Sequence, residues 1–301
     1  MKLFTPFYGK YLEYGAKLVE RLNWILPAVY TSEEEEYKMV RERAGVIDYS
    51  FQSGFAVAGR DAFIFLQKLI VNDLKRICPG KAIYSSILDN NGEIIDDTVV
   101  FWIEKDFFII NGGFRPNWKT LDWLKKNSKL FNVSLFETGT CFLALQGSKS
   151  REILQKAMSL NDLPYFGLKQ DKIGDIPVLV ARVSFSGELG FELYLQPWYA
   201  HELWNSIIGL GKDYDIGPYG MGVSTILANQ NGYITIDYEG LTPLELGLEW
   251  TVAFDKEDFI GKDALIKRKN EGLKTKLMGF EVADPKVVAA KGDNLVKETK
   301  W

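Results

Sequence analysis

The chain is predicted to fold as an α+β protein, and three observations lead to this prediction. Strand-like and helix-like segments are interspersed without the regular alternation of a doubly wound sheet. The dipeptide Asn91-Gly92 lies between two strand-like runs and predicts an antiparallel hairpin, because both turn residues accept a positive φ. The 301 residues are 47% hydrophobic and 14% aromatic, which is enough for a sizeable core. This length suits two domains, or one large domain with an appendage.

In the first half of the chain, capping residues and periodicity define the elements. Thr31-Ser32 and the four glutamates that follow predict the start of a helix that ends near Gly45. Asp61 is the expected N-cap of a second helix. The other segments expected here are strands at 55–58, 83–88, 95–103 and 107–111, and helices at 118–127 and 148–158.

The second half contains shorter segments separated by glycine and proline. A long connecting loop is expected between Gly209 and Gly222. The other segments expected here are strands at 177–185, 190–195 and 251–254, and helices at 198–208 and 263–270.

The strand that leaves the hairpin turn carries a candidate acid. Side chains alternate between the two faces of a strand, so Asp97 shares its face with Val99, Phe101 and Ile103. That face is the more apolar one, and we therefore expect Asp97 to point toward the interior. An inward carboxylate needs a partner, or its pKa rises. Asp97 is either a structural aspartate that caps the hairpin or a nearby helix, or a working acid.

Composition excludes several classes of function. The net charge is −4 and no long basic run occurs, so no nucleic-acid surface is expected. Neither the apolar core of a signal peptide nor a run of about 18 apolar residues is present, which predicts a cytoplasmic protein without a membrane span. Cys78 and Cys141 fit no metal spacing and are expected to be free, buried or half-buried thiols. His201 is the only histidine and is expected on a helix surface, which excludes a site with several histidine ligands, and no metal site is expected. Proton transfer is then expected to fall to carboxylates, tyrosines or the substrate.

A second acidic position lies in the run V-S-F-S-G-E-L-G-F-E-L-Y at residues 183–194. Alternation places Glu192 and Tyr194 on one face of the expected strand, and Phe191 and Leu193 on the other. Glu192 therefore faces either solvent or a pocket lined by an aromatic partner.

Nine short motifs occur in one order and together cover most of residues 1–282. They are R-x-x-A-G-V-I-D-Y-S (41–50), N-D-L (72–74), P-G-K-A-I-Y-S (79–85), N-G-E-I-I-D-D (91–97), I-I-N (109–111), L-Q-G-S-K (145–149), S-G-E-L-G-F-E-L (186–193), T-P-L-E-L-G-L (242–248) and D-F-I-G-K-D-A-L (258–265). This series resembles the glycine-cleavage T-protein family, which includes aminomethyltransferase and tetrahydrofolate-dependent demethylases.

The resemblance implies a fold. Residues 1–275 would form the folate-binding region of aminomethyltransferases, in which mixed and antiparallel sheets with flanking helices build two interlocked subdomains. Residues 276–301 would be the remnant of a truncated, β-rich C-terminal domain. An exposed strand edge there would favour a homo-oligomer.

The resemblance also implies site residues. Glu192 matches the glutamate that holds the pterin of tetrahydrofolate, whose pyrimidine edge presents N–H donors to a two-oxygen acceptor. Asp97 matches the catalytic aspartate, and Tyr84, on the strand paired with it, matches a further catalytic and pocket position. The other cofactor-binding positions implied are Gln52, Asn111, Phe185 and Ser224. At Phe185 and Ser224 the chain departs from the family, which has a tyrosine and an arginine there.

The activity implied is transfer of an aminomethyl or methyl group from a small-molecule donor to tetrahydrofolate, with a lipoyl carrier protein as a possible partner. Two other interpretations stay open. The chain could bind folate without turnover, or it could be a non-catalytic subunit that uses the old pocket region as an interface.

Overall fold

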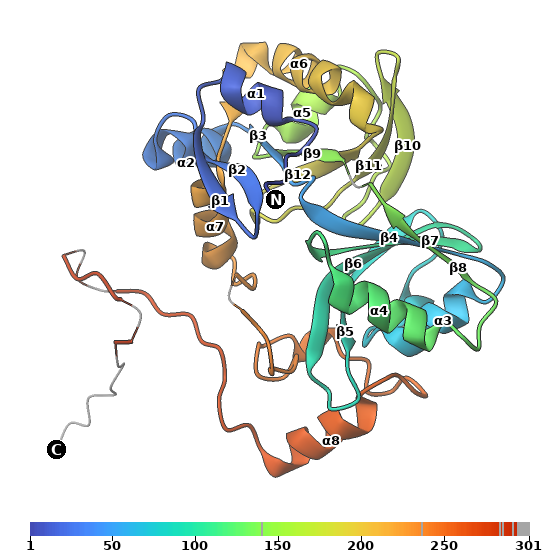
Figure 1. Ribbon diagram of the computed structural model, residues 1–301. Coiled ribbons are helices and arrows are strands. Elements are labelled where there is room, and N and C mark those ends of the chain that lie inside the picture. Colours follow the sequence, from blue (N-terminus) through green and yellow to red (C-terminus); the bar gives the residue numbers. More distant parts are fainter. Residues whose placement is uncertain (140, 236, 283, 285, 291, 294–301) are drawn as a thin grey trace.

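The computed structural model describes residues 1–293 except 140, 236, 283, 285 and 291. Two β-sheets form the centre of the molecule, and helices pack on their outer faces (Figure 1). A separate two-stranded sheet, β1 (Lys17–Arg21) and β2 (Trp24–Val29), lies beside them.

The first sheet has six strands and is antiparallel except at one edge. Its order is β10 (Leu168–Ile173), β11 (Ile176–Ala181), β12 (Gly190–Tyr194), β9 (Phe142–Gln146), β3 (Gly45–Asp48) and β13 (Gly217–Pro218). The pair β13–β3 is parallel.

The second sheet has five antiparallel strands. Its order is β5 (Lys81–Leu88), β6 (Ile94–Glu104), β7 (Phe107–Phe114), β4 (Gln52–Ala58) and β8 (Ser134–Thr138). The chain passes from the first sheet to the second between β3 and β4, and returns between β8 and β9. The second sheet is thus inserted between β3 and β9 of the first, and the expected α+β fold with mixed and antiparallel sheets is confirmed.

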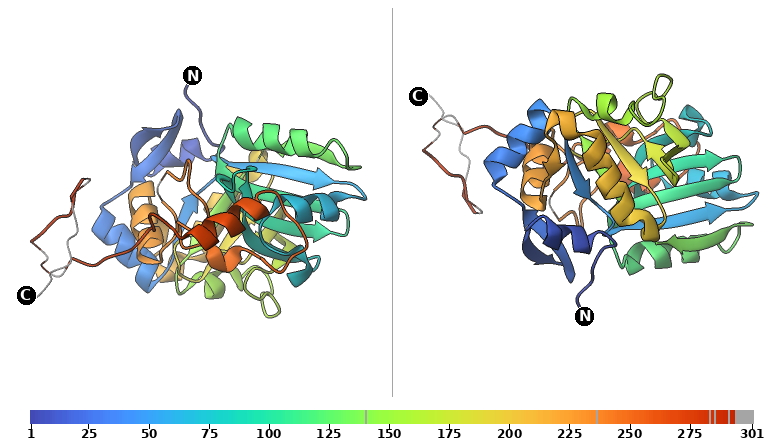
Figure 2. Two further views of the ribbon diagram at one scale, coloured as in Figure 1. Left: turned by 90° about the horizontal axis from the view of Figure 1, so that it is seen from below. Right: turned by 90° about the horizontal axis from the view of Figure 1, so that it is seen from above.

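Helices cover the outer faces of both sheets (Figures 1 and 2). On the first sheet lie α1 (Tyr8–Glu13), α5 (Ser150–Leu154) and α6 (Ala200–Leu210), and at its β3 end lie α2 (Glu33–Glu42) and α7 (Met221–Gln230). On the second sheet lie α3 (Ala62–Leu69) and α4 (Trp118–Asn127), and α8 (Lys262–Glu271) packs against the β5–β6 hairpin. Short 3-10 turns occur at 74–76, 197–199, 212–214 and 249–251.

The expected elements agree with these bounds where a cap or a strong period defines them. The Ser32 side chain accepts a hydrogen bond from the Glu35 backbone amide at 3.2 Å and begins α2. The prediction of a helix at 118–127 matches α4. Segments without such signals were missed, among them β8, β9, β10 and α7.

Four expectations were wrong in detail. The helix expected at 148–158 is shortened to α5, and 251–254 begins as a 3-10 turn and forms no strand. The loop expected at 209–222 contains β13, which pairs with β3. Asp61 makes no side-chain cap to α3, because its carboxylate accepts the backbone amide of Asn132 at 2.7 Å instead.

The hairpin turn also differs from the expected two-residue form. Gly92 takes a positive φ of 80°, but Asn91 does not. The Asp89 carboxylate accepts the backbone amides of Asn91 and Glu93 at 2.9 Å each. These bonds stabilise a longer loop that ends in a left-handed glycine, which is another common hairpin connection.

The described residues after α8 run away from the two sheets as an extended chain (Figure 1). The Leu277 backbone amide donates to the Glu245 carbonyl at 2.7 Å near the start of this segment. Its described part contains no strand, whereas a β-rich remnant was expected at 276–301. Residues 294–301 of that prediction lie outside the described residues.

Candidate active site

Three strands of the second sheet bring several of the predicted residues into one row. In the strand register, Tyr84 on β5 pairs with Val99 on β6, and Val99 pairs with Asn111 on β7. Asp97 is two residues from Val99 and therefore shares its face. This face looks toward the first sheet, since Val99 packs with Ala181 of β11. Tyr84, Asp97 and Asn111 thus lie on one face of the second sheet.

The surroundings of the Asp97 carboxyl bring its pKa close to neutral pH. The residue is half-buried, but its Oδ1 atom is enclosed and has no hydrogen-bond partner among the described residues. Burial raises the pKa of Asp97 to about 7, a hydrogen bond from Tyr84 opposes this rise, and the charge of Asp96 adds to it. A carboxyl with this pKa can hold or release a proton near neutral pH.

Tyr84 connects Asp97 to an aromatic surface. Its ring stacks on Trp250 with the centroids 5.9 Å apart, and 68% of Trp250 is exposed. Burial raises the pKa of Tyr84, and the neighbouring Asp97 charge raises it further. Tyr238 lies close enough to accept a hydrogen bond from the Asp97 backbone amide. Tyr84 therefore remains a neutral donor beside the carboxylate.

Glu192 lies on β12 of the opposite sheet and is 8% exposed, so of the two open possibilities the pocket orientation is correct. Its aromatic partner is Tyr194, whose hydroxyl donates to Glu192 Oε2 at 2.6 Å. Burial raises the pKa of Glu192 to about 7, and this hydrogen bond opposes the rise.

Asn111 joins the two sheets. Its Nδ2 donates to Tyr194 Oη and to Gln52 Oε1, both at 3.0 Å. The Asn111 Oδ1 atom is buried without a hydrogen-bond partner in the described structure. Predicted residues from β4, β7 and β12 are therefore linked to one another through Tyr194, which the sequence had placed on the same face as Glu192.

Ser224 and Phe185 are brought together by a different residue, Tyr49. Ser224 is buried on α7, and its Oγ lies 2.7 Å from Tyr49 Oη. The Phe185 ring meets Tyr49 edge-on at 6.2 Å and stacks on Tyr233 at 5.5 Å. The charge of Glu192 raises the pKa of Tyr49, although burial is the larger cause. The Ser224 hydroxyl is thus occupied within the protein.

Asp96 was not considered for any role, yet it is fully buried. Its carboxylate accepts the Gly113 backbone amide at 3.1 Å, Asn117 Nδ2 at 2.9 Å and Thr120 Oγ1 at 2.9 Å. These bonds fix the end of β7 to the first turn of α4. Asp96 is therefore structural, and its neighbour Asp97 is left as the carboxylate with an open acceptor.

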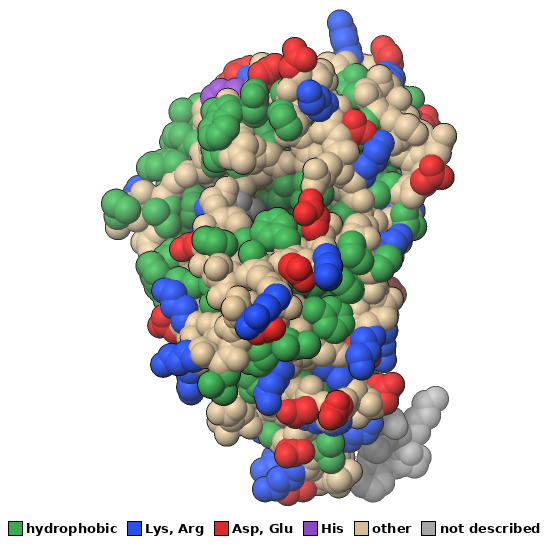
Figure 3. Space-filling view, turned by 90° about the vertical axis from the view of Figure 1, so that its right-hand side faces the viewer, with side chains coloured by type: hydrophobic (Ala, Val, Ile, Leu, Met, Phe, Trp, Pro, Cys, Tyr) green, Lys and Arg blue, Asp and Glu red, His purple; other side chains and the backbone are tan. Residues whose placement is uncertain are grey.

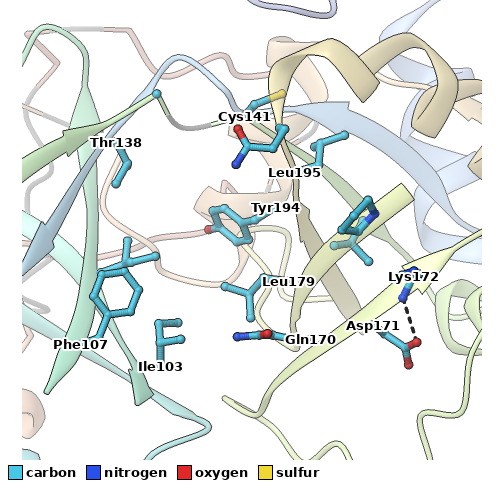
Figure 4. Close-up of a pocket in the computed structure, with 15 residues that line it drawn as sticks. Ile103, Phe107, Thr138, Cys141, Gln170, Asp171, Lys172, Leu179, Tyr194 and Leu195 are labelled. Carbon is cyan, nitrogen blue, oxygen red and sulfur yellow. Dashed lines mark hydrogen bonds between the residues drawn. The ribbon is translucent and has the colours of Figure 1, made fainter. Parts of the chain in front are cut away.

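A cavity of about 840 Å³ is lined by residues from strands of both sheets (Figure 4). Tyr194 forms part of its wall, with Thr138 and Cys141 toward one end and Gln170 toward the other. Figure 3 shows the side of the molecule that lies to the right in Figure 1; acidic and basic side chains alternate there with hydrophobic ones. Tyr194 is thus shared between the cavity and the buried carboxylate.

Other predicted features can be checked in the described residues. No group of three or more His, Cys, Asp or Glu side chains among them could hold a metal ion. No helix in this part of the chain is long and apolar enough to cross a membrane. His201 lies exposed in the first turn of α6, as expected. Both cysteines are free; Cys141 is buried, whereas Cys78 is exposed, contrary to the expectation for it.

The chain is similar to proteins of known family. It matches the model of the GCVT N-terminal domain over residues 7–256. An aminomethyltransferase of Thermoanaerobacter pseudethanolicus is 38% identical over 288 residues, which cover 93% of this chain and 78% of that protein. An aminomethyltransferase of Thermotoga maritima is 35% identical over 300 residues, which cover 97% and 82%.

One solved structure supports the fold independently. The crystal structure of glycine cleavage system aminomethyltransferase T from Bartonella henselae superposes with a TM-score of 0.83 at 23% identity. The superposition covers 90% of this chain and 76% of that one. This likeness confirms the α+β architecture that the sequence predicted.

Proposed function

The chain belongs to the glycine-cleavage T-protein family, and from this premise we propose that it transfers a one-carbon group, aminomethyl or methyl, to tetrahydrofolate. The observation that carries the proposal is a set of acceptor side chains, Asp97 and Asn111 on the second sheet and Glu192 on the first, of which Asn111 and Glu192 are linked through Tyr194. Asp97 Oδ1 and Asn111 Oδ1 have no hydrogen-bond partner among the described residues, and Glu192 offers its second carboxylate oxygen.

The residues present fit a reduced pterin. A buried acceptor without a donor costs about 1–3 kcal/mol, so these atoms are suited to a ligand that donates N–H groups. The pyrimidine edge of a pterin presents adjacent N–H donors, which a carboxylate such as Glu192 can accept together. The Asn111 and Asp97 oxygens suit further N–H groups of the same ligand.

Each residue then has a distinct role. Glu192 holds the pterin, and Asn111 accepts a further donor. Bound tetrahydrofolate supplies the nitrogen that receives the one-carbon group. Asp97, with its pKa near 7, holds or accepts a proton and stabilises positive charge that develops at the carbon. Tyr84 orients the Asp97 carboxylate through their hydrogen bond and keeps it in one position.

An aminomethyl donor is the first candidate, because the similar proteins of Thermoanaerobacter pseudethanolicus and Thermotoga maritima are aminomethyltransferases. In that case a lipoyl carrier protein would present the donor. An N-methyl or O-methyl donor is the alternative, and the rings of Phe185 and Tyr233 at the Glu192 side suit an apolar or aromatic one.

A second candidate function is folate binding without turnover. Ser224 supports it, because its hydroxyl is bonded to Tyr49 and brings no positive charge to the site. An arginine at this position would interact differently with an anionic or carbonyl group of a ligand.

Calorimetric titration with tetrahydrofolate tests the proposal. We expect Glu192→Gln to weaken binding by roughly 30- to 100-fold, the loss of a charge-assisted contact. Asp97→Asn should bind tetrahydrofolate but transfer the one-carbon group at least about 100-fold more slowly. Glu20→Gln, an exposed change on β1, is the matched control.

Three outcomes separate the candidates. Absence of binding to the unaltered protein at millimolar tetrahydrofolate would refute both folate functions. Binding without transfer from an aminomethylated lipoyl compound, an N-methylated amino acid or an O-methylated aromatic acid would favour the second candidate. Transfer that survives Asp97→Asn unchanged would remove the role given to that residue.

A further inference from the structure

Four side chains form one continuous hydrogen-bond chain from the second sheet to the first. Asn111 Nδ2 donates to Gln52 Oε1 and to Tyr194 Oη, each at 3.0 Å. Tyr194 Oη in turn donates to Glu192 Oε2 at 2.6 Å. We call these four residues the Glu192 chain. It connects β4 and β7 to β12, so it also spans the two sheets.

The direction of this chain follows from the chemistry of its members. A tyrosine hydroxyl has one proton and can donate it only once. Because Gln52 accepts from the Asn111 amide group, the nitrogen of that amide faces Tyr194, and Tyr194 must accept there. Its single proton is then available for Glu192. With the Asn111 amide turned over, Tyr194 would donate to the amide oxygen and leave Glu192 without this bond.

Aromatic packing keeps the Tyr194 ring in place. The ring stacks on Phe142 with centroids 4.5 Å apart and planes at 19°. Phe101, from the opposite sheet, meets it edge-on at 5.3 Å and 79°. Both phenylalanines are fully buried, and such pairs favour one ring orientation. The hydroxyl can therefore reach Glu192 without a conformational search.

We infer that Tyr194 is a positioning residue: it holds the Glu192 carboxylate in one rotamer and leaves the Oε1 atom for the ligand, while Gln52 sets the direction of the chain. The positioning itself is a property of the ligand-free protein. The inference rests on the proposed function only in naming tetrahydrofolate as the ligand that benefits.

The surroundings of Glu192 make this role measurable. Three buried tyrosines feel the charge of Glu192: Tyr194 on its own strand, Tyr49 between β3 and β4, and Tyr219 before α7. Burial raises the pKa of each of them, so they stay neutral below pH 9. Glu192, with its pKa raised to about 7, is the group among them that changes charge near neutrality.

Tyr194→Phe removes the hydroxyl and keeps the ring. Carbon-13 NMR of glutamate-labelled, ligand-free protein should show the Glu192 midpoint rising by about one pH unit, because the bond that favours its ionised form is lost. Tyr214→Phe is the matched control, since Tyr214 donates to Glu152 Oε2 at 3.0 Å on the surface. That variant should leave the Glu192 midpoint unchanged.

The binding measurement adds a readout that general loss of structure would not give. Tyr194→Phe should weaken tetrahydrofolate binding about tenfold at pH 7 and by less at pH 9, where Glu192 is ionised in both proteins. Gln52→Met should shift the Glu192 midpoint in the same direction but by less, since only the orientation of the chain is relaxed.

A Glu192 midpoint that does not move in Tyr194→Phe would overturn the inference, and so would an equal loss of affinity at both pH values. A shifted midpoint in a protein that does not bind tetrahydrofolate would support the positioning role and refute the proposed function alone.

Discussion

The exchange of aspartate for asparagine at Asp97 should stabilise the folded protein at pH 8, whereas the same exchange at Asp96 should destabilise it by about 2 kcal/mol. The two residues are adjacent on β6 and differ in their partners. Three donors surround the Asp96 carboxylate, and an asparagine there turns its own N–H₂ group toward at least one of them. Burial raises the pKa of Asp96 to about 6 and the three bonds oppose this rise, so the exchange also removes a cost of burying the charge. We expect the loss of one or two bonds in this fully buried site to exceed that gain.

For Asp97 the magnitude follows from its raised pKa. The unfolded chain releases this proton near pH 3.8, but the folded protein releases it only near pH 7. Between these values the folded state binds more protons, so its stability falls as the pH rises from about 4 to about 7 and then levels off. Three pH units correspond to about 4 kcal/mol, and we halve this figure because the residue is half-buried rather than enclosed. Asp97→Asn should thus gain about 1–2 kcal/mol at pH 8 and almost nothing at pH 4.

Urea unfolding at pH 4, 6 and 8, followed by tryptophan fluorescence, measures both exchanges. The control is the unaltered protein at each pH, since other groups titrate over the same range. A loss of more than about 1 kcal/mol at pH 8 in Asp97→Asn would refute the reasoning, because a carboxylate that is satisfied in the folded state would behave in that way. A gain of the same size at every pH would refute it as well, because such a gain would not come from the ionisation of Asp97.

Two further predictions concern residues outside the row of acceptors. Cys78 should react with iodoacetamide in the native protein at pH 8 while Cys141 should not, because Cys141 is buried and its pKa is raised to about 12. Mass spectrometry of the alkylated peptides measures this, and equal labelling of the two cysteines would contradict it. Ser224→Ala should lower the free energy of unfolding by about 1 kcal/mol, because it breaks the 2.7 Å hydrogen bond to Tyr49. A loss below about 0.3 kcal/mol in urea titrations would mean that Tyr49 finds another partner.

The position of Asp97 could be predicted from the sequence because it depends on alternation along one strand. The pattern identified the face that packs against the other sheet. It could not show that the opposite face is also covered, because that depends on α3 and α4, which lie far along the chain. Thr98 and Asp96 made the second face look polar, yet Asp96 is completely enclosed by bonds to α4 and its flanking residues. A polar side chain on a strand does not mark solvent when local donors satisfy it.

Contacts between distant segments explain the rest of what was missed. Tyr194 was assigned to the same face as Glu192, but its bond to Asn111 spans 83 positions and depends on how the two sheets pack. Ser224 meets Tyr49 across 175 positions, on the helix α7 that the sequence did not predict. Only a resemblance to a family drew attention to Ser224, and only the three-dimensional structure shows that its hydroxyl is already bonded.

The open acceptors on the two sheets connect folding to ligand binding. Burial with too few hydrogen-bond donors disfavours the ionised forms of Asp97 and Glu192, and this lowers the stability of the folded protein. The pKa of each is raised to about 7 as a result. A ligand that brings N–H groups to them favours their ionised forms, so its binding lowers both pKa values and removes part of that destabilisation. The same bonds would be worth less on a surface, where water already satisfies the carboxylates. Under the proposed function, a donor ligand would supply the bonds that these acceptors lack, while Asp96 and its bonds to Asn117 and Thr120 hold the strand that carries Asp97.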